Sequence, residues 1–174
     1  MKLRLSQNFW LSELTKSSTA DRTGIENEPT IEEIVNLTVL THHVLQPVRD
    51  KFGVITVNSG YRGPELNAKV GGSKTSQHCF GMAADIKDLN GTPTSDLFNW
   101  IVDNIPAWDQ VIWEFPERGS RSWVHIYYNK DRNRRRTTLA SKSDYIHDQY
   151  GGYRNGSYQE DIKRAYPDYI SPST

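Results

Sequence analysis

Apolar residues change their spacing along the chain, and each change predicts an element of structure. From 31 to 52 they recur every three or four positions, which predicts one long helix that ends at Gly53. A capping box just before the first apolar residue supports this start. Pro47 cannot donate a backbone hydrogen bond inside such a helix, so we expect a bend or a split near Val44.

Shorter apolar runs, bounded by turn residues, predict the remaining elements. We expect strands at 54–60, 81–88, 109–115 and 122–128, with a hairpin loop between the last two. Helical segments are expected at 8–14, 63–72 and 94–105, and a polar loop at 15–24. This order of elements favours an α+β fold, in which a small antiparallel sheet is flanked by helices.

The length of 174 residues suits one domain with a hydrophobic core. We expect the core domain to span 1–130, with 1–29 as a lead segment. The tail, 131–174, is rich in Tyr, Gly and polar residues. We expect it to form a surface extension of the same domain, with a short helix near 158–165.

Charge and composition exclude some classes of function. The formal net charge of zero argues against a protein that binds nucleic acid through bulk charge. The basic run at 130–136 allows two readings, a solvated loop and a site for a polyanion. No segment is apolar enough to span a bilayer, and the N-terminus lacks the apolar core of a signal peptide. We therefore expect a protein made soluble in the cytoplasm, or one exported by a route that its sequence does not encode.

Two residues could act as nucleophiles, and the sequence favours neither. Cys79 is the one cysteine, which excludes an internal disulfide and a cysteine-based zinc knuckle. It lies next to His78, but no Cys-His-Asn pattern supports a thiol nucleophile, and a buried small thiol is the more usual role. Ser76 has no base at catalytic spacing, so we expect it to orient other groups instead.

Two histidines and one aspartate indicate a metal site. His78 and Asp85 flank a turn at Gly81, which can fold both side chains toward one point. His125 lies in the middle of an aromatic strand and could supply a third ligand. Three such ligands leave the fourth zinc position for water, which is the layout of a catalytic site. The spacing alone also fits an accidental pair in a plain α+β domain.

The motif around these residues is specific. The segments "SGYR" (59–62), "SQHCFGMAADI" (76–86) and "WVHI" (123–126) occur in this order. They resemble the zinc D-Ala-D-Ala carboxypeptidase family, whose pattern Ser-x-His-x-x-Gly-x-Ala-x-Asp is matched by Ser76, His78, Gly81, Ala83 and Asp85. The resemblance implies the fold that this family shares with D-Ala-D-Ala dipeptidases, phage endolysins and the hedgehog signalling domain.

The resemblance also implies a mechanism. It implies one Zn²⁺ ion held by His78, Asp85 and His125, which would activate a bound water and polarise the scissile carbonyl. Arg62 matches the family arginine that binds a substrate carboxylate or steadies the developing oxyanion. A surface arginine in a turn is the plainer alternative for Arg62.

The sequence departs from the family at the general base. Many members carry an acid or a histidine a few positions before the last ligand, but residues 119–123 hold neither. Glu114 in the neighbouring strand is our candidate base, and a strand-edge glutamate in a salt bridge is the alternative. The other nearby acid, Glu117, is expected to be solvated in the loop.

Together these expectations describe a zinc peptidase that hydrolyses peptide bonds of bacterial peptidoglycan, with stem peptides as its partners. The expected substrate-binding residues are Arg62, Ser76, Gln110 and Trp113. The absence of a signal peptide suits a phage enzyme, released during lysis or carried in a virion. The alternative is a non-catalytic, zinc-containing module that binds the cell wall or belongs to a phage particle. The sequence does not decide between a carboxypeptidase and an endopeptidase.

Overall fold

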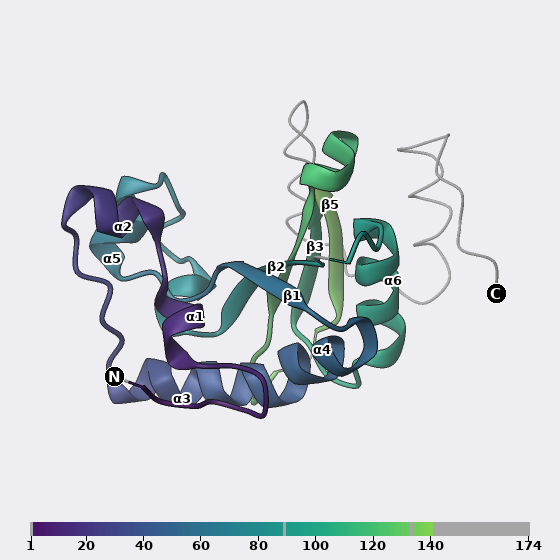
Figure 1. The fold of residues 1–174 in the computed structure, drawn as a ribbon, viewed down its shortest axis with the longest axis horizontal. Helices are drawn as coiled ribbons and strands as arrows, with labels where there is room; N and C mark the ends of the chain where they lie inside the picture. The colour runs from purple at the N-terminus through teal and green to yellow at the C-terminus, as the bar shows by residue number, and fades with distance from the viewer. Residues whose placement is uncertain (1, 89, 133, 141–174) are drawn as a thin grey trace.

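The computed structural model describes residues 2–88, 90–132 and 134–140, and its centre is a five-stranded sheet (Figure 1). The strands, in spatial order, are β1 Ile55–Ser59, β2 Ala83–Asp88, β4 Trp123–Tyr127, β3 Gln110–Glu114 and β5 Arg136–Ala140. The first three neighbouring pairs are antiparallel, and β5 joins β3 in parallel. The expected α+β fold with a mostly antiparallel sheet is therefore confirmed.

Helices connect the strands of this sheet, and some of them pack against it. They are α1 Leu11–Thr15, α2 Ser18–Thr23, α3 Ile31–Leu40, α4 Gln46–Phe52, α5 Pro64–Lys69 and α6 Thr94–Asn104. Two 3₁₀ turns, Gln77–Phe80 and Pro116–Arg121, precede β2 and β4. Among the described residues, no helix combines the length and the apolar character needed to cross a membrane.

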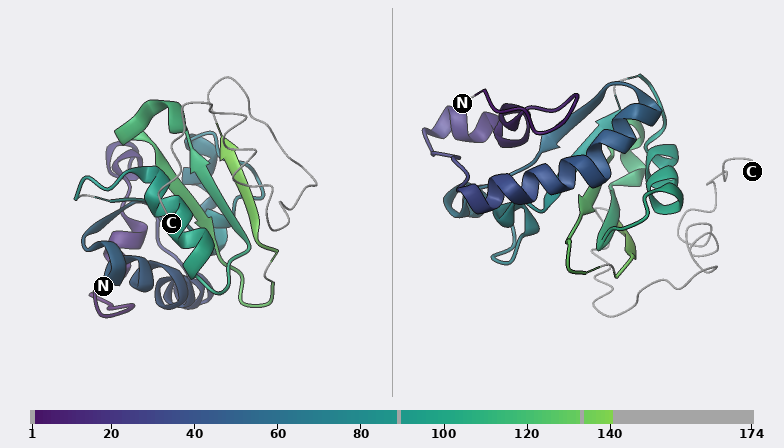
Figure 2. Two further views of the ribbon diagram at one scale, coloured as in Figure 1. Left: turned by 90° about the vertical axis from the view of Figure 1, so that its right-hand side faces the viewer. Right: turned by 90° about the horizontal axis from the view of Figure 1, so that it is seen from below.

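The long helix expected over 31–52 is present as a single rod with an irregular middle (Figure 2, right). A π-helical segment, Thr41–Leu45, joins α3 to α4, and Gln46 donates its backbone N–H to the oxygen of Thr41, five residues earlier. This shift starts a new hydrogen-bond register, so Pro47 lies in the first turn of α4, where its missing N–H is tolerated.

One local expectation was wrong. The segment expected to be a polar loop at 15–24 contains helix α2. The Ser17 hydroxyl accepts a hydrogen bond from the N–H of Ala20, and Gly24 ends the helix with a left-handed backbone. Of this short helix only Ala20 is buried, so its caps, rather than an apolar stripe, mark it in the sequence.

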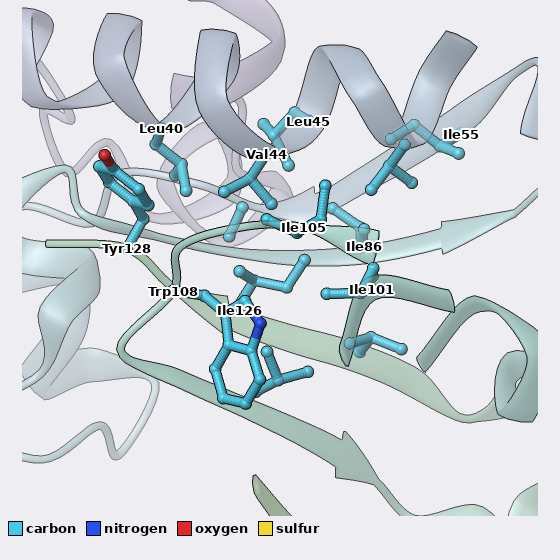
Figure 3. Packing of buried hydrophobic residues seen from close by; sticks show 14 of the residues in the cluster. Leu40, Val44, Leu45, Ile55, Ile86, Ile101, Ile105, Trp108, Ile126 and Tyr128 are labelled. Atoms are coloured by element: carbon cyan, nitrogen blue, oxygen red, sulfur yellow. The ribbon is translucent and has the colours of Figure 1, made fainter. Parts of the chain in front are cut away.

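The hydrophobic core lies between one face of the sheet, the α3–α4 rod and α6 (Figure 3). Ile86 and Ile126 point from the sheet toward Leu40 and Val44 of the rod and toward Ile101 of α6 (Figure 3). Because side chains alternate along a strand, the residues next to these point to the opposite face. Asp85 and His125 therefore share the face of the sheet that is turned away from the core.

A glycine fixes the turn that enters β2. Gly81 has a left-handed backbone (φ 65°), and a Cβ at this position would lie 2.6 Å from the backbone oxygen of Glu33 in α3. We expect Gly81→Ala to lower the free energy of unfolding by about 2–4 kcal/mol, since backbone strain and steric overlap add. Urea unfolding measures this loss.

Gly24 provides a matched control for that substitution. It has a similar φ of 70°, but a Cβ there would meet no atom within 4 Å. Gly24→Ala should therefore show the backbone strain alone, about 1 kcal/mol. Equal losses in the two variants would contradict the contact with Glu33.

The sheet extends past the boundary that we expected at residue 130. Strand β5 pairs with β3 from Gln110↔Arg136 to Glu114↔Ala140, although the two strands are far apart in the sequence. The wider division into a core domain and a surface extension stays a prediction, and the helix expected near 158–165 lies outside the described residues.

The basic run at 130–136 has a structural role that the sequence did not reveal. Asp109 is completely buried, and its carboxylate accepts hydrogen bonds from Arg132 (3.1 Å) and Arg134 (2.5 Å). Arg135 instead donates to the carbonyl of Val102 (2.7 Å) near the end of α6. The run thus holds the turn before β5 against β3 and α6.

Removing the charge of Asp109 should weaken this arrangement. Burial alone would raise the pKa of its carboxyl, but the hydrogen bonds and charges of Arg134 and Arg132 outweigh burial and lower that pKa. We expect Asp109→Asn to lower the free energy of unfolding by about 1–3 kcal/mol at pH 7, a loss limited by the exposure of the arginines.

The pH dependence of that loss has a defined sign. A lowered carboxyl pKa gives stability above the unfolded-state value near pH 4, and this stability disappears as the pH falls through the lowered pKa. Urea unfolding at pH 7 and pH 3 should therefore show a smaller difference between wild type and variant at pH 3. Asp131→Asn, which removes an exposed pair with Lys130, is the control and should change little.

Candidate metal centre

Three side chains meet on the face of the sheet turned away from the core. The register pairs Asp85 of β2 directly with His125 of β4, and the Nδ1 atom of His125 lies 2.8 Å from Oδ1 of Asp85. His78 reaches them from the 3₁₀ turn before β2, with its Nε2 atom 3.2 Å from Nδ1 of His125 and 3.4 Å from Oδ1 of Asp85. The structure thus brings together the three residues expected to bind zinc.

A backbone carbonyl fixes which nitrogen His78 presents. The Nδ1 atom of His78 lies 2.7 Å from the carbonyl oxygen of Gly60. A carbonyl can only accept a hydrogen bond, so Nδ1 carries the proton and Nε2 keeps its lone pair. This is the hydrogen bond that commonly orients a histidine ligand in metal sites.

The donor atoms fit a zinc ion in both spacing and chemistry. Tetrahedral bonds of about 2.0–2.2 Å place neighbouring ligand atoms about 3.3 Å apart. The three observed separations, 2.8, 3.2 and 3.4 Å, lie around that value. Nitrogen and carboxylate oxygen are ligands that zinc accepts, and a cation would relieve the repulsion between their electron pairs.

The protonation states also favour a metal ligand set. Burial lowers the pKa of His78 and so favours the neutral ring that binds a metal. Burial alone would raise the pKa of Asp85, but the charges and hydrogen bonds of His78 and His125 outweigh it and lower that pKa. Within the part of the chain that the structure describes, no fourth His, Cys, Asp or Glu joins the cluster, so a bound ion would keep a position for water.

Arg62 and Ser76 lie beside His78. The backbone N–H of Arg62 donates to the oxygen of His78 (3.2 Å), and its guanidinium lies 3.4 Å from the Ser76 hydroxyl. Ser76 is nearly buried at the start of the 3₁₀ turn. The Nε atom of Arg62 is buried without a hydrogen-bond partner among the described residues, while the residue as a whole is half-buried and lines a cleft.

Glu114 ends β3 on the same face of the sheet as His125. It pairs with Trp123, two residues before His125, while Ile112 pairs with His125 itself. Burial raises the pKa of Glu114, and the charge of Asp85 raises it further, against the opposing effect of His125. No described residue forms a salt bridge with Glu114, and β3 is an interior strand, so the alternative of a strand-edge ion pair has no support.

The structure does not bring every expected site residue to the cluster. Trp113 points to the opposite face of the sheet, where it is nearly buried in the core and packs 6.1 Å from the ring of Phe98. Because adjacent strand residues face opposite sides, Trp113 lies away from the metal cluster, beside another cleft that it lines with Ser120 and Ser122. Its role in substrate binding stays a prediction. Gln110 shares the face of His125 but lies at the other end of β3, opposite Tyr127.

Cys79, the other candidate nucleophile, does not belong to the cluster. Burial raises the pKa of Cys79, which disfavours the thiolate that a nucleophile needs. Glu117 lies in the 3₁₀ turn after β3. Of the other histidines in the chain, His43 stacks on Tyr128 with ring centroids 5.1 Å apart, and His147 falls outside the described residues.

Two residues that support the site were missed by sequence reasoning. Gly60 orients His78 through its carbonyl, and a pattern of side chains in the sequence cannot predict a backbone acceptor. Asn27 bonds the carbonyls of Thr15 (2.7 Å) and Tyr61 (3.1 Å) and accepts from the N–H of Gly63 (2.8 Å). The one sequence signal for Asn27 is a short polar residue in an irregular segment, which is common in loops.

Two histidines and an aspartate that converge on one point of an α+β domain form the donor set of a site for a single metal ion. The chain belongs to the Peptidase M15 family, whose family model matches residues 7–126, more than half of its length. Peptidases of this family are zinc-dependent, which agrees with the donor set found here. No curated protein matches the chain.

Proposed function

We propose that the protein is a zinc peptidase that hydrolyses peptide bonds in the stem peptides of bacterial peptidoglycan, and that His78, Asp85 and His125 hold its zinc ion. The observation that carries this proposal is the convergence of three donor atoms within 3.4 Å of one another. The family resemblance of the surrounding motif supports the choice of substrate.

Each neighbouring side chain has a role in this proposal. A bound zinc ion would supply an activated water and a polarised carbonyl. The Glu114 carboxylate would accept a proton from the attacking water and donate it to the leaving amine, a task suited to a carboxyl whose pKa burial has raised. The Arg62 guanidinium binds a substrate carboxylate or the oxygen that becomes negative.

Digestion of purified sacculi tests the proposal. We expect the zinc-loaded protein to release fragments that mass analysis identifies, with new free amino groups at the cut bond. A chelator should abolish the release, and added zinc should restore it. Release of single D-Ala residues identifies a carboxypeptidase, whereas larger fragments identify an endopeptidase.

The same assay can overturn the proposal. A folded, zinc-loaded protein that binds wall fragments but releases none would favour the non-catalytic module instead. Release during phage lysis, or carriage in a virion, stays a prediction from the sequence alone.

A further inference from the structure

A cleft of about 370 Å³ lies on the β1 side of the metal centre. One wall is the segment 16–19 at the start of α2, and the other is the end of β1 with Arg62. Figure 1 shows α2 beside α5, and Val70, which follows α5, closes the cleft at that side. Its volume suits one amino-acid residue of a peptide rather than a long chain.

This cleft is joined to the metal centre through a few residues. Gly60, which holds His78, precedes Tyr61 and Arg62 of the cleft, and the N–H of Arg62 bonds the oxygen of His78. Ser59, another lining residue, pairs with Asp85 in the sheet. A peptide bound at the metal can therefore place a neighbouring residue in this cleft.

The wall formed by residues 16–19 is held against the end of β1 by hydrogen bonds and close packing. The N–H of Tyr61 donates to the oxygen of Leu14 (2.7 Å), and Gly60 packs so closely on Leu14 that a Cβ would overlap it. Asn27 ties the carbonyl of Thr15 to that of Tyr61. The cleft is thus formed before any ligand binds, which lowers the entropy cost of binding.

The chemistry of the lining favours a carboxylate. Lys16 and Arg62 are its charged residues, and the rest of the lining is hydroxyl, amide and apolar. Lys16 is exposed, and neither Lys16 nor Arg62 forms an ion pair with a described residue. Two cations without an acid in one cleft give a positive field that a carboxylate would neutralise.

We propose that Lys16, together with Arg62, forms a specificity subsite that holds a carboxylate-bearing residue of the substrate next to the scissile bond. This inference rests on the proposed function, because it assigns the substrate residue that the cleft accepts. Lys16 is then a specificity residue contributed by the lead segment, and Asn27 is a positioning residue that holds its wall in place.

The test compares N-acetyl-glutamate with N-acetyl-glutamine, each as the D and the L enantiomer, by NMR titration of the zinc-loaded full-length protein. The two probes differ in one carboxylate. We expect the tighter-binding enantiomer of N-acetyl-glutamate to bind at least about tenfold tighter than N-acetyl-glutamine of the same configuration. This is the effect of one charge-assisted hydrogen bond. Lys16→Glu should remove this preference, and Lys16→Met should reduce it.

Lys51→Glu makes the same charge change at an exposed residue of α4 outside the cleft and should keep the preference. Equal binding of the two probes to wild type, or an unchanged preference in Lys16→Glu, would overturn the inference. If the carboxylate of the probe bound only to the zinc ion, the preference would be unchanged in Lys16→Glu. Because binding is measured without turnover, failure of the proposed hydrolysis would appear in the sacculus assay and not here.

Discussion

Replacing His125 by alanine should abolish both zinc binding and hydrolysis. The Nδ1 atom of His125 lies within 3.2 Å of both other donor atoms, so its loss leaves two ligands for the ion. The loss of zinc affinity should exceed the roughly 10–100-fold that follows when an outer hydrogen-bond partner is removed. The rate of cleavage should fall by roughly 10³-fold or more, which corresponds to about 4 kcal/mol of transition-state stabilisation.

Three measurements check this expectation: the zinc content of untagged protein, the release of fragments from sacculi, and thermal unfolding with and without a chelator. A chelator should lower the unfolding temperature of wild type, because an ion that binds the folded state stabilises it. It should have no effect on His125→Ala. His42→Ala changes an exposed histidine in the π-helical segment and serves as the control. A His125→Ala variant with full zinc content would refute the assigned ligand set.

Replacing Glu114 by glutamine should lower kcat by about 10²–10⁴-fold, the usual contribution of a general acid–base group. Zinc content should not change, since Glu114 is not one of the three converging ligands. Stability should not fall either, because the substitution removes a partly buried charge that no described residue pairs. Zinc content, kcat and the unfolding temperature of the same preparation give the three readouts.

The pH profile gives a second readout of the same variant. A base must be deprotonated to act, so the raised pKa of Glu114 shifts the acidic limb of kcat/KM to a higher pH than an ordinary glutamate would give. The glutamine variant should lose this limb. Glu117→Gln, the other acid of this hairpin, should keep both the limb and the rate. A Glu114→Gln enzyme with normal kcat would exclude Glu114 as the base.

The metal cluster could be predicted because its geometry follows from local rules. His78 and Asp85 are linked by a turn that glycine permits, and His125 and Asp85 are paired across neighbouring antiparallel strands. The same alternation places Trp113 away from the cluster, because Trp113 and Glu114 are adjacent in β3 and face opposite sides of the sheet. Proximity in the sequence groups these two residues, whereas the alternation of side chains along the strand separates them.

Other features could not be read from the sequence for physical reasons. Strand β5 pairs in parallel with β3, and such pairing depends on distant contacts rather than on a local turn signal. The buried Asp109 and its arginines are spread over two segments, so each looks like an ordinary charged residue. The cleft beside Arg62 likewise joins residues 16–19 to the end of β1, a contact that no periodicity predicts.

The hydrogen bond from His78 to Gly60 has an experimental consequence of its own. Because the acceptor belongs to the main chain, no amino-acid exchange removes it, and a mutational scan would record Gly60 only as a position intolerant of bulk. An amide-to-ester replacement at the Gly60–Tyr61 linkage, made by chemical ligation, weakens that carbonyl as an acceptor. The same replacement removes the N–H of Tyr61, which donates to the oxygen of Leu14, so this semisynthetic protein would report the combined effect of both main-chain hydrogen bonds on the site, a quantity hidden from conventional genetics.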